Sequence, residues 1–566
     1  MAPTRLQALD VTTLRAVLAE WRPLLLPSRF EKAQQASPHA LQVGLRSLSG
    51  AHWLELSWQA EAPRLHTVPP PPRQGDGSTL AQQLQHGLRG LALVEILQQG
   101  WERVVELGFA RRPGEAVQRW LVVELMGRHS NLLLLDADRQ VVALARQVKA
   151  QQSRLRPIGT GDPYQPPPPL AGEPPRLEEG FESWQRRLRL VPLPLAGALR
   201  GAYQGISPAL LRQLLPAGWG ERTVAELGSA DWQQLWRAWQ HWLACVAQEH
   251  FSWRQEPGGY RCWGDPPEAQ DPDAARTGAS QPVNRGLATY YGQHLAAQEL
   301  LQKRQQLRHR IEAAISRERR QASEQQELLE AVPESDALQQ RADALLSQQQ
   351  PSRQCIEEAQ KLYKTARKRR RSVAAITPRL ELHHQRLAWL EASLTYLEQA
   401  DGLDQIRGLA AELDNLLGER SQRAPGGGRQ ARRSPGADGV PQPLELHTAS
   451  GLPVQVGRNH RQNEWIALRQ ARRGDLWFHA QEQPGSHVVL KSSERLASDA
   501  DLQAAADLAA HFSRGRGNHR VPVVMVPAEE LQRIPGTAPG TVRHRGGTVL
   551  WGEPQRALSL LPEQRP

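Results

Sequence analysis

The chain has 566 residues, and its 70 Lys and Arg outnumber its 59 Asp and Glu, for a formal net charge of +11. A single hydrophobic core stops growing near about 250 residues, so this length excludes a one-domain protein. The positive charge and the 17 Trp favour a polyanionic partner, above all a nucleic acid with bases that stack on indole rings. A genome that uses Arg wherever Lys would serve accounts for part of the same excess.

Cysteine spacing and hydropathy limit the class of protein further. Cys245, Cys262 and Cys355 are far apart, which fits a reducing compartment and excludes a disulfide framework or a cysteine-based zinc site. The N-terminal residues lack the apolar segment of a signal peptide, and no window approaches the roughly 18 uncharged apolar residues of a membrane-spanning helix. We therefore expect a cytoplasmic protein with no membrane partner.

Residues 1–175 are predicted to form a mixed α/β domain. Apolar residues at helical spacing from Leu14 to Trp21 predict an amphipathic helix, and a second helix is predicted over residues 80–100. Apolar runs predict strands within residues 39–48, 52–58, 119–127 and 131–144. A run of four prolines at 166–169 predicts a stiff, extended segment that ends this domain.

Residues 176–288 show a short helical pattern. The stretch from Tyr203 to Leu227 predicts a helix, a hairpin containing Gly218 and Gly220, and a second helix. In helix-hairpin-helix modules such a turn points backbone N–H groups at a phosphate. Two small helices that pack on a core explain the same pattern equally well.

Residues 289–422 are predicted to form an antiparallel coiled-coil hairpin. Leu380, Leu387 and Leu394 share one heptad position, and Leu390 and Leu397 follow the last two by three residues, which is an a/d seam. A second helix of similar composition, "ELLQKRQQLRHRIEAAI", precedes this one. Between the two, prolines are expected to break the helices and to isolate a small tip, at positions Pro333, Pro351 and Pro378.

The predicted tip carries a run of six basic residues within "LYKTARKRRRS". Such a run is either a phosphate-binding patch or an ordinary solvated helix face. The patch is favoured because no acidic residues interrupt the run. Contact with a large polyanionic partner is the role that we expect for its members, which are Lys364, Arg367, Lys368, Arg369, Arg370 and Arg371.

Residues 423–442 have the composition of a flexible linker, and residues 443–566 are predicted to form a compact α/β domain. Within that domain, a helix over residues 462–473 ends at Gly474, and "DLWFH" and "HVVLKS" form two strands around the turn "QEQPGS". A capped Ala-rich helix follows, and then "RGRGNHRVPVVMVP", a basic loop that enters a buried strand.

Planar, cationic and amide side chains gather around the predicted hairpin, a combination that suits RNA bases and phosphates. Catalysis or metal binding is disfavoured, because His479 and His487 lack helical i, i+4 spacing and no third ligand is near. Trp465 and Phe478 are equally well explained as core residues. The candidate RNA-binding residues are Arg458, Asn459, Arg461, Trp477, His479, Ser486, His487 and Lys491.

Several long segments resemble the NFACT family. "GRNHRQNEWIALRQARRGDLWFHAQEQPGSHVVLK" is similar to the signature of the family's C-terminal RNA-binding domain, and "VVELMGRHSNLLLLDADRQVV" to that of its N-terminal domain. "SRLRPIGTGDPYQPPP" and "EEAQKLYKTARKRRRS" also resemble family segments, in the expected order. The resemblance covers nearly the whole chain, and the domain order is similar to that of the family's bacterial ribosome quality control factors.

The resemblance implies a multidomain α+β fold. The N-terminal domain would be similar to formamidopyrimidine-type DNA glycosylases, followed by a helix-hairpin-helix module, the coiled-coil hairpin and a compact α/β RNA-binding domain. It also implies tRNA handling by an Asp-Arg pair that aligns with Glu102 and Arg103, where this chain has Glu in place of the family's Asp. The N-terminal signature adds Arg128, His129 and Asn131 to this tRNA-binding set.

The implied function is that of a binding factor without a cofactor or catalytic residues. Such proteins bind, as monomers, a large ribosomal subunit that carries stalled peptidyl-tRNA. They recruit alanyl-tRNA and promote template-free addition of alanines, while the subunit itself performs peptide transfer.

Two rival functions follow from related proteins. DNA glycosylases of the similar fold attack with an N-terminal Pro amine followed by Glu, whereas here Pro3 lies between Ala2 and Thr4, and the three cysteines exclude a four-cysteine zinc finger. An adhesin is the other rival, because some relatives are called fibronectin-binding proteins. The N-terminal residues lack the pattern of a signal peptide, which argues against secretion as an adhesin.

Overall fold

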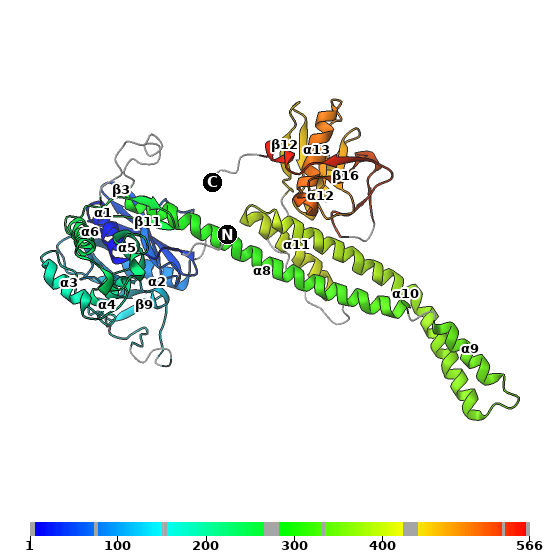
Figure 1. The fold of residues 1–566 in the computed structure, drawn as a ribbon, viewed down its shortest axis with the longest axis horizontal. Coiled ribbons are helices and arrows are strands. Elements are labelled where there is room, and N and C mark those ends of the chain that lie inside the picture. The colour runs from blue at the N-terminus through cyan, green and yellow to red at the C-terminus, as the bar shows by residue number, and fades with distance from the viewer. Residues whose placement is uncertain are drawn as a thin grey trace. The chain divides into compact units, whose positions relative to one another are not determined.

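The computed structural model describes residues 6–72, 77–149, 151, 156–264, 282–330, 334–422, 440–534 and 538–561, and it divides into two compact units, Met1–Ala296 and Ala297–Pro566 (Figure 1). Among these described residues, no helix combines the length and the apolar character that crossing a bilayer requires.

The first unit is built on a nine-stranded sheet in which every neighbouring pair is antiparallel. The strand order is β4-β3-β2-β1-β5-β6-β7-β8-β9, so two meanders join where β1 pairs with β5. The strands are β1 (Ser28–Ser37), β2 (Ala40–Ser47), β3 (Gly50–Ser57), β4 (Arg64–Val68), β5 (Ala92–Leu97), β6 (Val104–Ala110), β7 (Arg119–Glu124), β8 (Asn131–Leu135) and β9 (Val141–Leu144).

Two helices pack their apolar residues on one face of this sheet. α1 (Val11–Leu25) is capped by Asp10, and its buried side chains include the predicted Leu14 and Trp21. α2 (Thr79–Leu88) contributes Leu84 and Leu88 to the same core. The predicted amphipathic helix is therefore confirmed, and the sheet face it covers carries the largest core of the unit.

The predicted helix over residues 80–100 is wrong in its second half. α2 ends at Leu88, Gly90 adopts a φ of +79°, and β5 starts at Ala92. Glycine tolerates this left-handed conformation, so the chain reverses there at little cost. Leu93 and Ile96 then enter the sheet core. Gly100 consequently lies in the turn between β5 and β6 and does not end a helix.

A helical module follows in the first unit. It contains α3 (Phe181–Arg189), α4 (Leu195–Ala202), α5 (Pro208–Leu214) and α6 (Ser229–Ala247), with a small hairpin of β10 (Arg254–Glu256) and β11 (Gly259–Arg261). The helix-hairpin-helix prediction is not confirmed, because two short 3₁₀ turns, η2 (Trp219–Glu221) and η3 (Val224–Glu226), stand where its second helix was expected.

Tryptophans fill the core of this module. Trp184, Trp232, Trp239 and Trp242 are completely enclosed, and their rings contact one another at centroid distances from 5.1 to 6.0 Å. Indoles of this size bury large apolar areas and pair well edge to face. The tryptophan excess in this region therefore serves packing, not the base stacking that composition suggested.

Long helices dominate the first half of the second unit. α8 (Val283–Glu330) and α10 (Arg353–Glu398) run antiparallel there, because Arg308 pairs with Glu398 and Arg319 with Glu391. Their seam contains Leu390 and Leu397 as predicted, with Ile311 opposite. α9 (Glu334–Leu346) packs against α10, and α11 (Leu403–Gln422) packs beside the seam.

The prolines act only partly as predicted. Pro351 lies between α9 and α10, which begins after the capping residue Ser352. Pro378 lies inside α10, so the prediction that it breaks the helix is wrong. A proline removes one helical hydrogen bond, and packing along a 46-residue helix tolerates that loss. Pro333, and all of the predicted linker except its last three residues, lie outside the described residues.

The C-terminal half of the second unit is a six-stranded antiparallel sheet of order β12-β13-β15-β14-β16-β19. Its strands are β12 (Leu444–His447), β13 (Pro453–Val456), β14 (Leu476–Ala480), β15 (Val488–Leu490), β16 (Val521–Pro527) and β19 (Thr548–Gly552), and a separate pair is β17 (Gln532–Arg533) with β18 (Val542–Arg543). α13 (Asp499–His511) packs on one face, and α12 (His460–Trp465) precedes a π-helical turn, Ile466–Gln470.

Candidate nucleic-acid interface

The turn between β5 and β6 is held in one shape by side-chain hydrogen bonds to its carbonyl groups. Gly100 has a φ of +53°, and its carbonyl accepts a 2.7 Å hydrogen bond from Arg15 Nη2. The Arg15 guanidinium also lies 4.2 Å from the ring centroid of Trp101, which is buried against the tryptophan cluster. The Gln98 side chain donates to the Glu102 carbonyl at 2.8 Å. This turn is thus a rigid loop rather than a free one.

Glu102 and Arg103 sit at the end of that turn, half-buried. Glu102 Oε1 accepts a 3.0 Å hydrogen bond from the backbone N–H of Leu170, so it anchors the proline-rich segment that closes the domain. Arg103 Nη1 donates to the Leu9 carbonyl at 3.4 Å, a long bond. Burial lowers the pKa of Arg103, while the charges of Asp10 and Glu102 raise it. The pair therefore has structural partners already.

The second predicted tRNA motif lies beside the first. The backbone N–H of Leu125 donates to the Arg103 carbonyl at 2.9 Å, which brings η1 (Gly127–His129) next to the turn. Arg128 and His129 are exposed on η1. Asn131 is buried, and its amide bonds the backbone of Arg146 at 2.8 and 2.9 Å. Asn131 therefore shapes the loop, and Arg128 and His129 of η1 face solvent.

An ion pair that sequence inspection did not identify joins two of the family-like motifs. Glu124, at the end of β7, is buried and binds the Arg156 guanidinium through both carboxylate oxygens. The Tyr164 hydroxyl donates to the same carboxylate at 3.0 Å. These residues occur in "VVELMG" and "RPIGTGDPY", so each motif supplies part of one buried cluster. In the sequence, the Glu of the first motif and the Arg of the second were the features that could have predicted this ion pair.

The basic run lies on α10 and divides into two groups. Arg369 Nη1 bonds Glu334 at 2.6 Å, and Arg370 bonds Asp336 and Gln339, all on the facing helix α9. The other four cations are exposed and form no hydrogen bond or ion pair with any residue that the structure describes: Lys364, Arg367, Lys368 and Arg371. The run itself contains no acidic residues, and the carboxylates that pair with two of its arginines belong to α9.

At the start of α12, three predicted RNA-binding residues serve the contact between the long helices and the sheet domain. Arg458 donates to the Gln399 carbonyl at 2.8 Å and pairs with Asp401. The Asn459 side chain caps the helix by accepting from Gln462 N at 2.8 Å. Arg461 is exposed, and its backbone N–H bonds Glu412 at 2.9 Å. The Arg461 guanidinium, unlike that of Arg458, bonds no residue in the part of the chain that the structure describes.

Trp477 is a core residue, which corrects the expectation that it stacks on a base. Its side chain is 2% exposed and packs with Ile466, Val489 and Val526. Its ring stacks on His479, with centroids 5.6 Å apart and planes 7° apart. Alternation along β14 correctly placed both residues on one face, but the segment after α12 covers Trp477. No ring face remains for a nucleotide.

The histidines beside Trp477 are neutral. Burial lowers the pKa of His479 to about 4 and holds that of His487 well below its usual value. His487 Nδ1 and Ser486 Oγ are buried without a hydrogen-bond partner among the described residues. Lys491 Nζ bonds the Gln470 carbonyl at 2.9 Å and Asp475 at 3.3 Å. Neutral rings and a paired lysine give this cluster little attraction for phosphate.

A cluster around one buried histidine, His460, also not identified from the sequence, joins α10 to the sheet domain. His460 stacks on Trp389 with centroids 4.0 Å apart, and its Nε2 lies 2.9 Å from Ser393 Oγ. The Tyr396 hydroxyl donates to the Gly485 carbonyl at 2.9 Å. Burial lowers the pKa of His460 to about 3, which keeps its ring neutral.

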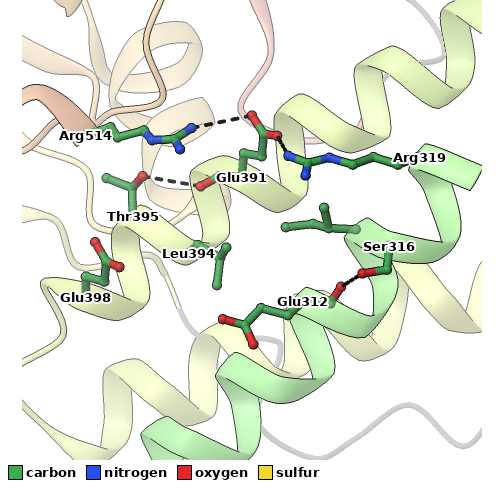
Figure 2. Close-up of a pocket in the computed structure, with 9 residues that line it drawn as sticks. Glu312, Ser316, Arg319, Glu391, Leu394, Thr395, Glu398 and Arg514 are labelled. Carbon is green, nitrogen blue, oxygen red and sulfur yellow. Dashed lines mark hydrogen bonds and ion pairs between the residues drawn. The ribbon is translucent and has the colours of Figure 1, made fainter. Parts of the chain in front are cut away.

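An open groove of about 270 Å³ lies between α8, α10 and the loop before β16. Figure 2 shows Glu391 between two guanidinium groups, at 2.8 Å from Arg319 and 3.9 Å from Arg514. Glu312 and Glu398 also line it. With three carboxylates and two guanidinium groups, the groove does not attract phosphate.

Two family models match the chain in order along its length. The NFACT N-terminal and middle domains match residues 10–352 and 348–425, and the NFACT protein RNA binding domain matches residues 444–546. Together they span both compact units. The chain belongs to the NFACT family and contains an RNA-binding domain.

Relatives of known designation align over nearly the whole chain. Rqc2 homolog RqcH from Streptococcus pneumoniae serotype 2 is 26% identical over 587 residues, covering 98% of this chain and 97% of its own. Rqc2 homolog RqcH from Streptococcus suis is 25% identical, covering 95% and 96%. The protein of that designation from Bacillus subtilis is 30% identical over 195 residues, 34% of this chain and 32% of its own. The family and these relatives support a ribosome quality control factor.

Solved structures of two fragments from Streptococcus suis also resemble parts of the chain. The C-terminal part of its fibronectin/fibrinogen-binding protein is 26% identical with a TM-score of 0.38, covering 46% of this chain and 98% of its own. The N-terminal part is 21% identical with a TM-score of 0.39, covering 50% and 99%.

Proposed function

We propose that this protein binds large ribosomal subunits obstructed by peptidyl-tRNA, recruits alanyl-tRNA and promotes template-free addition of alanines to the stalled chain. The observation that carries the proposal is the ordered match of both NFACT models, which leaves little of the chain unassigned. The tailed chain would then be marked for degradation. The factor acts as a monomer on the subunit.

The charge distribution supports the division of labour in this proposal. Four exposed cations on α10 suit the phosphates of ribosomal RNA, whose contacts are electrostatic and independent of sequence. The rigid turn at Arg103 and the exposed Arg128 and His129 suit a specific ligand such as tRNA, which is recognised by shape and by base edges. Contact with a subunit and selection of a tRNA thereby belong to different regions.

The protein acts in this proposal as a binding factor, and the ribosomal subunit supplies peptide transfer. Ser486 and His487 are the adjacent pair with nucleophile and base chemistry in the RNA-binding domain. The Ser486 hydroxyl is buried without a hydrogen-bond partner in the described part of the chain, so no base activates it. This geometry does not support hydrolysis at that position.

The test is capture of the tagged full-length protein from gently lysed cells, followed by sequencing of the bound RNA and mass spectrometry of the bound chains. We expect large-subunit ribosomal RNA, one enriched tRNA and nascent chains with C-terminal alanines. A tag-only capture is the control. Recovery of damaged DNA or of a matrix protein without subunits would contradict the proposal, and tails of another amino acid would correct its tRNA.

A further inference from the structure

The face of the C-terminal sheet that carries Trp477 changes from buried to exposed along its strands. α13 covers the opposite face, which carries Phe478 and Val523. Pairing between β14, β16 and β19 arranges the residues of the first face in cross-strand rows, because paired residues share a face. Trp477 and Val526 form the buried end of this face.

The other end of that face is open. In the next row, His479 pairs with Val524, which pairs with Val549 of β19. Beyond it, Pro522 pairs with Trp551, and Gln481 continues β14 through a 2.8 Å hydrogen bond from its backbone N–H to the Pro522 carbonyl. Trp551 is 58% exposed. We call these open rows the Trp551 face, comprising His479, Gln481, Pro522, Val549 and Trp551.

Trp551 stands apart from the other tryptophans. All 17 lie within the described residues, and each of the others is buried or half-buried. Val549, beside it on β19, is 47% exposed. The exposed indole and the exposed valine give this edge strand an apolar surface, and an edge strand is a place where partners can pair or pack.

Cations flank both ends of this surface. Two glycines with φ of +66° and +127°, Gly546 and Gly547, turn the chain into β19, and a Cβ on Gly547 would lie 2.7 Å from Val524. Exposed Arg545 directly precedes these two glycines, and exposed Arg543 lies two residues before it. At the other end, the loop before β16 carries exposed Arg516.

The acids near the face are partly neutralised. Glu553 lies just past the end of β19, and Arg520 and Arg556 bind it at 2.9 and 3.5 Å. Glu482 lies exposed in the turn after Gln481. Arg543 and Arg545 form no ion pair with any residue that the structure describes. The surface is therefore apolar and planar at its centre and positive at its margins, which matches a strand of bases and phosphates.

We propose that the Trp551 face binds single-stranded RNA, with one base stacked on the Trp551 indole. Gln481, in the same row, has an amide that bonds a base edge, and Arg543 and Arg545 bind phosphates. From Trp551 to Gly547 the strand spans roughly 13 Å at about 3.3 Å per residue. One short RNA segment can therefore extend from the Trp551 indole toward the arginines that precede Gly547. This inference rests on the RNA-binding part of the proposed function and assigns it a surface.

The test measures anisotropy of a fluorescent 12-nucleotide oligoadenylate titrated with full-length protein. We expect Trp551→Ala to weaken binding about tenfold and Trp551→Phe to recover most of it, because any aromatic ring can stack. The matched control is Leu558→Ala, which removes another exposed apolar side chain of the C-terminal segment and leaves affinity unchanged. Melting temperatures should stay at the wild-type value in all three variants.

Sedimentation with large subunits separates this inference from the proposed function. Unchanged oligoadenylate affinity in Trp551→Ala, or no oligoadenylate binding by a wild-type protein that sediments with subunits, overturns the inference alone. If Trp551→Ala loses subunit sedimentation but keeps oligoadenylate affinity, the face contacts a protein and the inference is also overturned. If the wild type binds oligoadenylate through Trp551 but never sediments with subunits, the inference stands and the proposed function fails.

Discussion

The turn at Arg103 and the basic run of α10 carry positive charge in opposite environments. Arg103 is half-buried, and its guanidinium contacts the Leu9 carbonyl within the first unit. On α10, four of the six cations are exposed with no hydrogen bond or ion pair to any described residue. The family-like motif at Arg103 therefore corresponds to a side chain that the fold holds in place. The basic run of α10 corresponds to side chains that remain accessible to a ligand.

This difference predicts different sensitivities. A guanidinium fixed by its surroundings suits a contact whose geometry matters, such as a base edge or a single phosphate of tRNA. Exposed cations suit contacts whose number matters, and these are screened by salt. Substitution at Arg103 should affect selection of a ligand, and substitution on α10 should affect the strength of docking.

The largest effect is expected from Arg103→Ala. This variant should sediment with large subunits, fail to recruit tRNA and leave stalled chains without alanine tails, because the loss removes the guanidinium but leaves the other bonds of the turn in place. Sedimentation, bound tRNA and tail length should be measured on one preparation.

Arg139→Ala is the stability control for that experiment. Arg139 forms two 2.7 Å hydrogen bonds to Glu106 on the same sheet, so its loss tests what an internal ion pair contributes. We expect a lower melting temperature with tails retained. Normal tails from Arg103→Ala would refute the assignment of tRNA handling, and early melting with loss of subunit docking would make Arg103 a structural residue.

A smaller effect is expected on α10, where two matched double variants each remove two positive charges. Lys368→Gln with Arg371→Gln removes exposed cations and should reduce the slope of log affinity against log salt by about 1.5, at roughly 0.7 to 0.9 per phosphate contact. Arg369→Gln with Arg370→Gln removes cations paired with Glu334 and Asp336, so the slope should change less. Subunit binding at several salt concentrations gives both values. Equal slopes in all three proteins would make the run a solvated face.

Local signals predicted much of the C-terminal domain correctly. The Pro-Gly turn placed the hairpin of β14 and β15, and Ser498 with Asp501 forms the capping box that starts α13. Alternation also placed Trp477 opposite Phe478. It did not predict the burial of Trp477, which depends on packing against Ile466, Val489 and Val526.

The misassigned residues have the same physical origin. The acids that neutralise Arg369 and Arg370 are more than 30 residues away on α9, so the run itself does not show them. Residues 92–97 satisfy a helical pattern and a strand pattern alike, and pairing with β1 and β6 decides between them. Trp551 carried a usable signal, since "TVLWG" alternates after a double glycine, but it lies beyond the family-like motif.

The smallest effect is expected from the buried junction at His460, and it is a change in how stability depends on pH. Burial lowers the pKa of His460 from 6.5 to about 3, so protonation favours the unfolded chain. Its contribution to stability is fully present above about pH 6.5 and is lost as the pH falls toward 3. Glu412 acts in the opposite direction: burial raises its pKa from 4.5 to about 7, so its contribution is present below pH 4.5 and lost as the pH rises through 7.

His479 and His487 have lowered pKa values as well, so three histidines outweigh one glutamate and acid should destabilise the second unit. His460→Gln keeps a hydrogen-bonding side chain near Ser393 but cannot titrate. In urea unfolding of the full-length protein at pH 7.5, we expect this variant to be about 1–2 kcal/mol less stable, through the lost ring stacking and bond geometry. The gap should close near pH 5, because the wild type loses up to about 1.36 kcal/mol per pH unit that the variant retains. Parallel pH profiles for the two proteins would show that His460 does not bind a proton on unfolding, and the junction would then owe its acid sensitivity to the histidines beside Trp477.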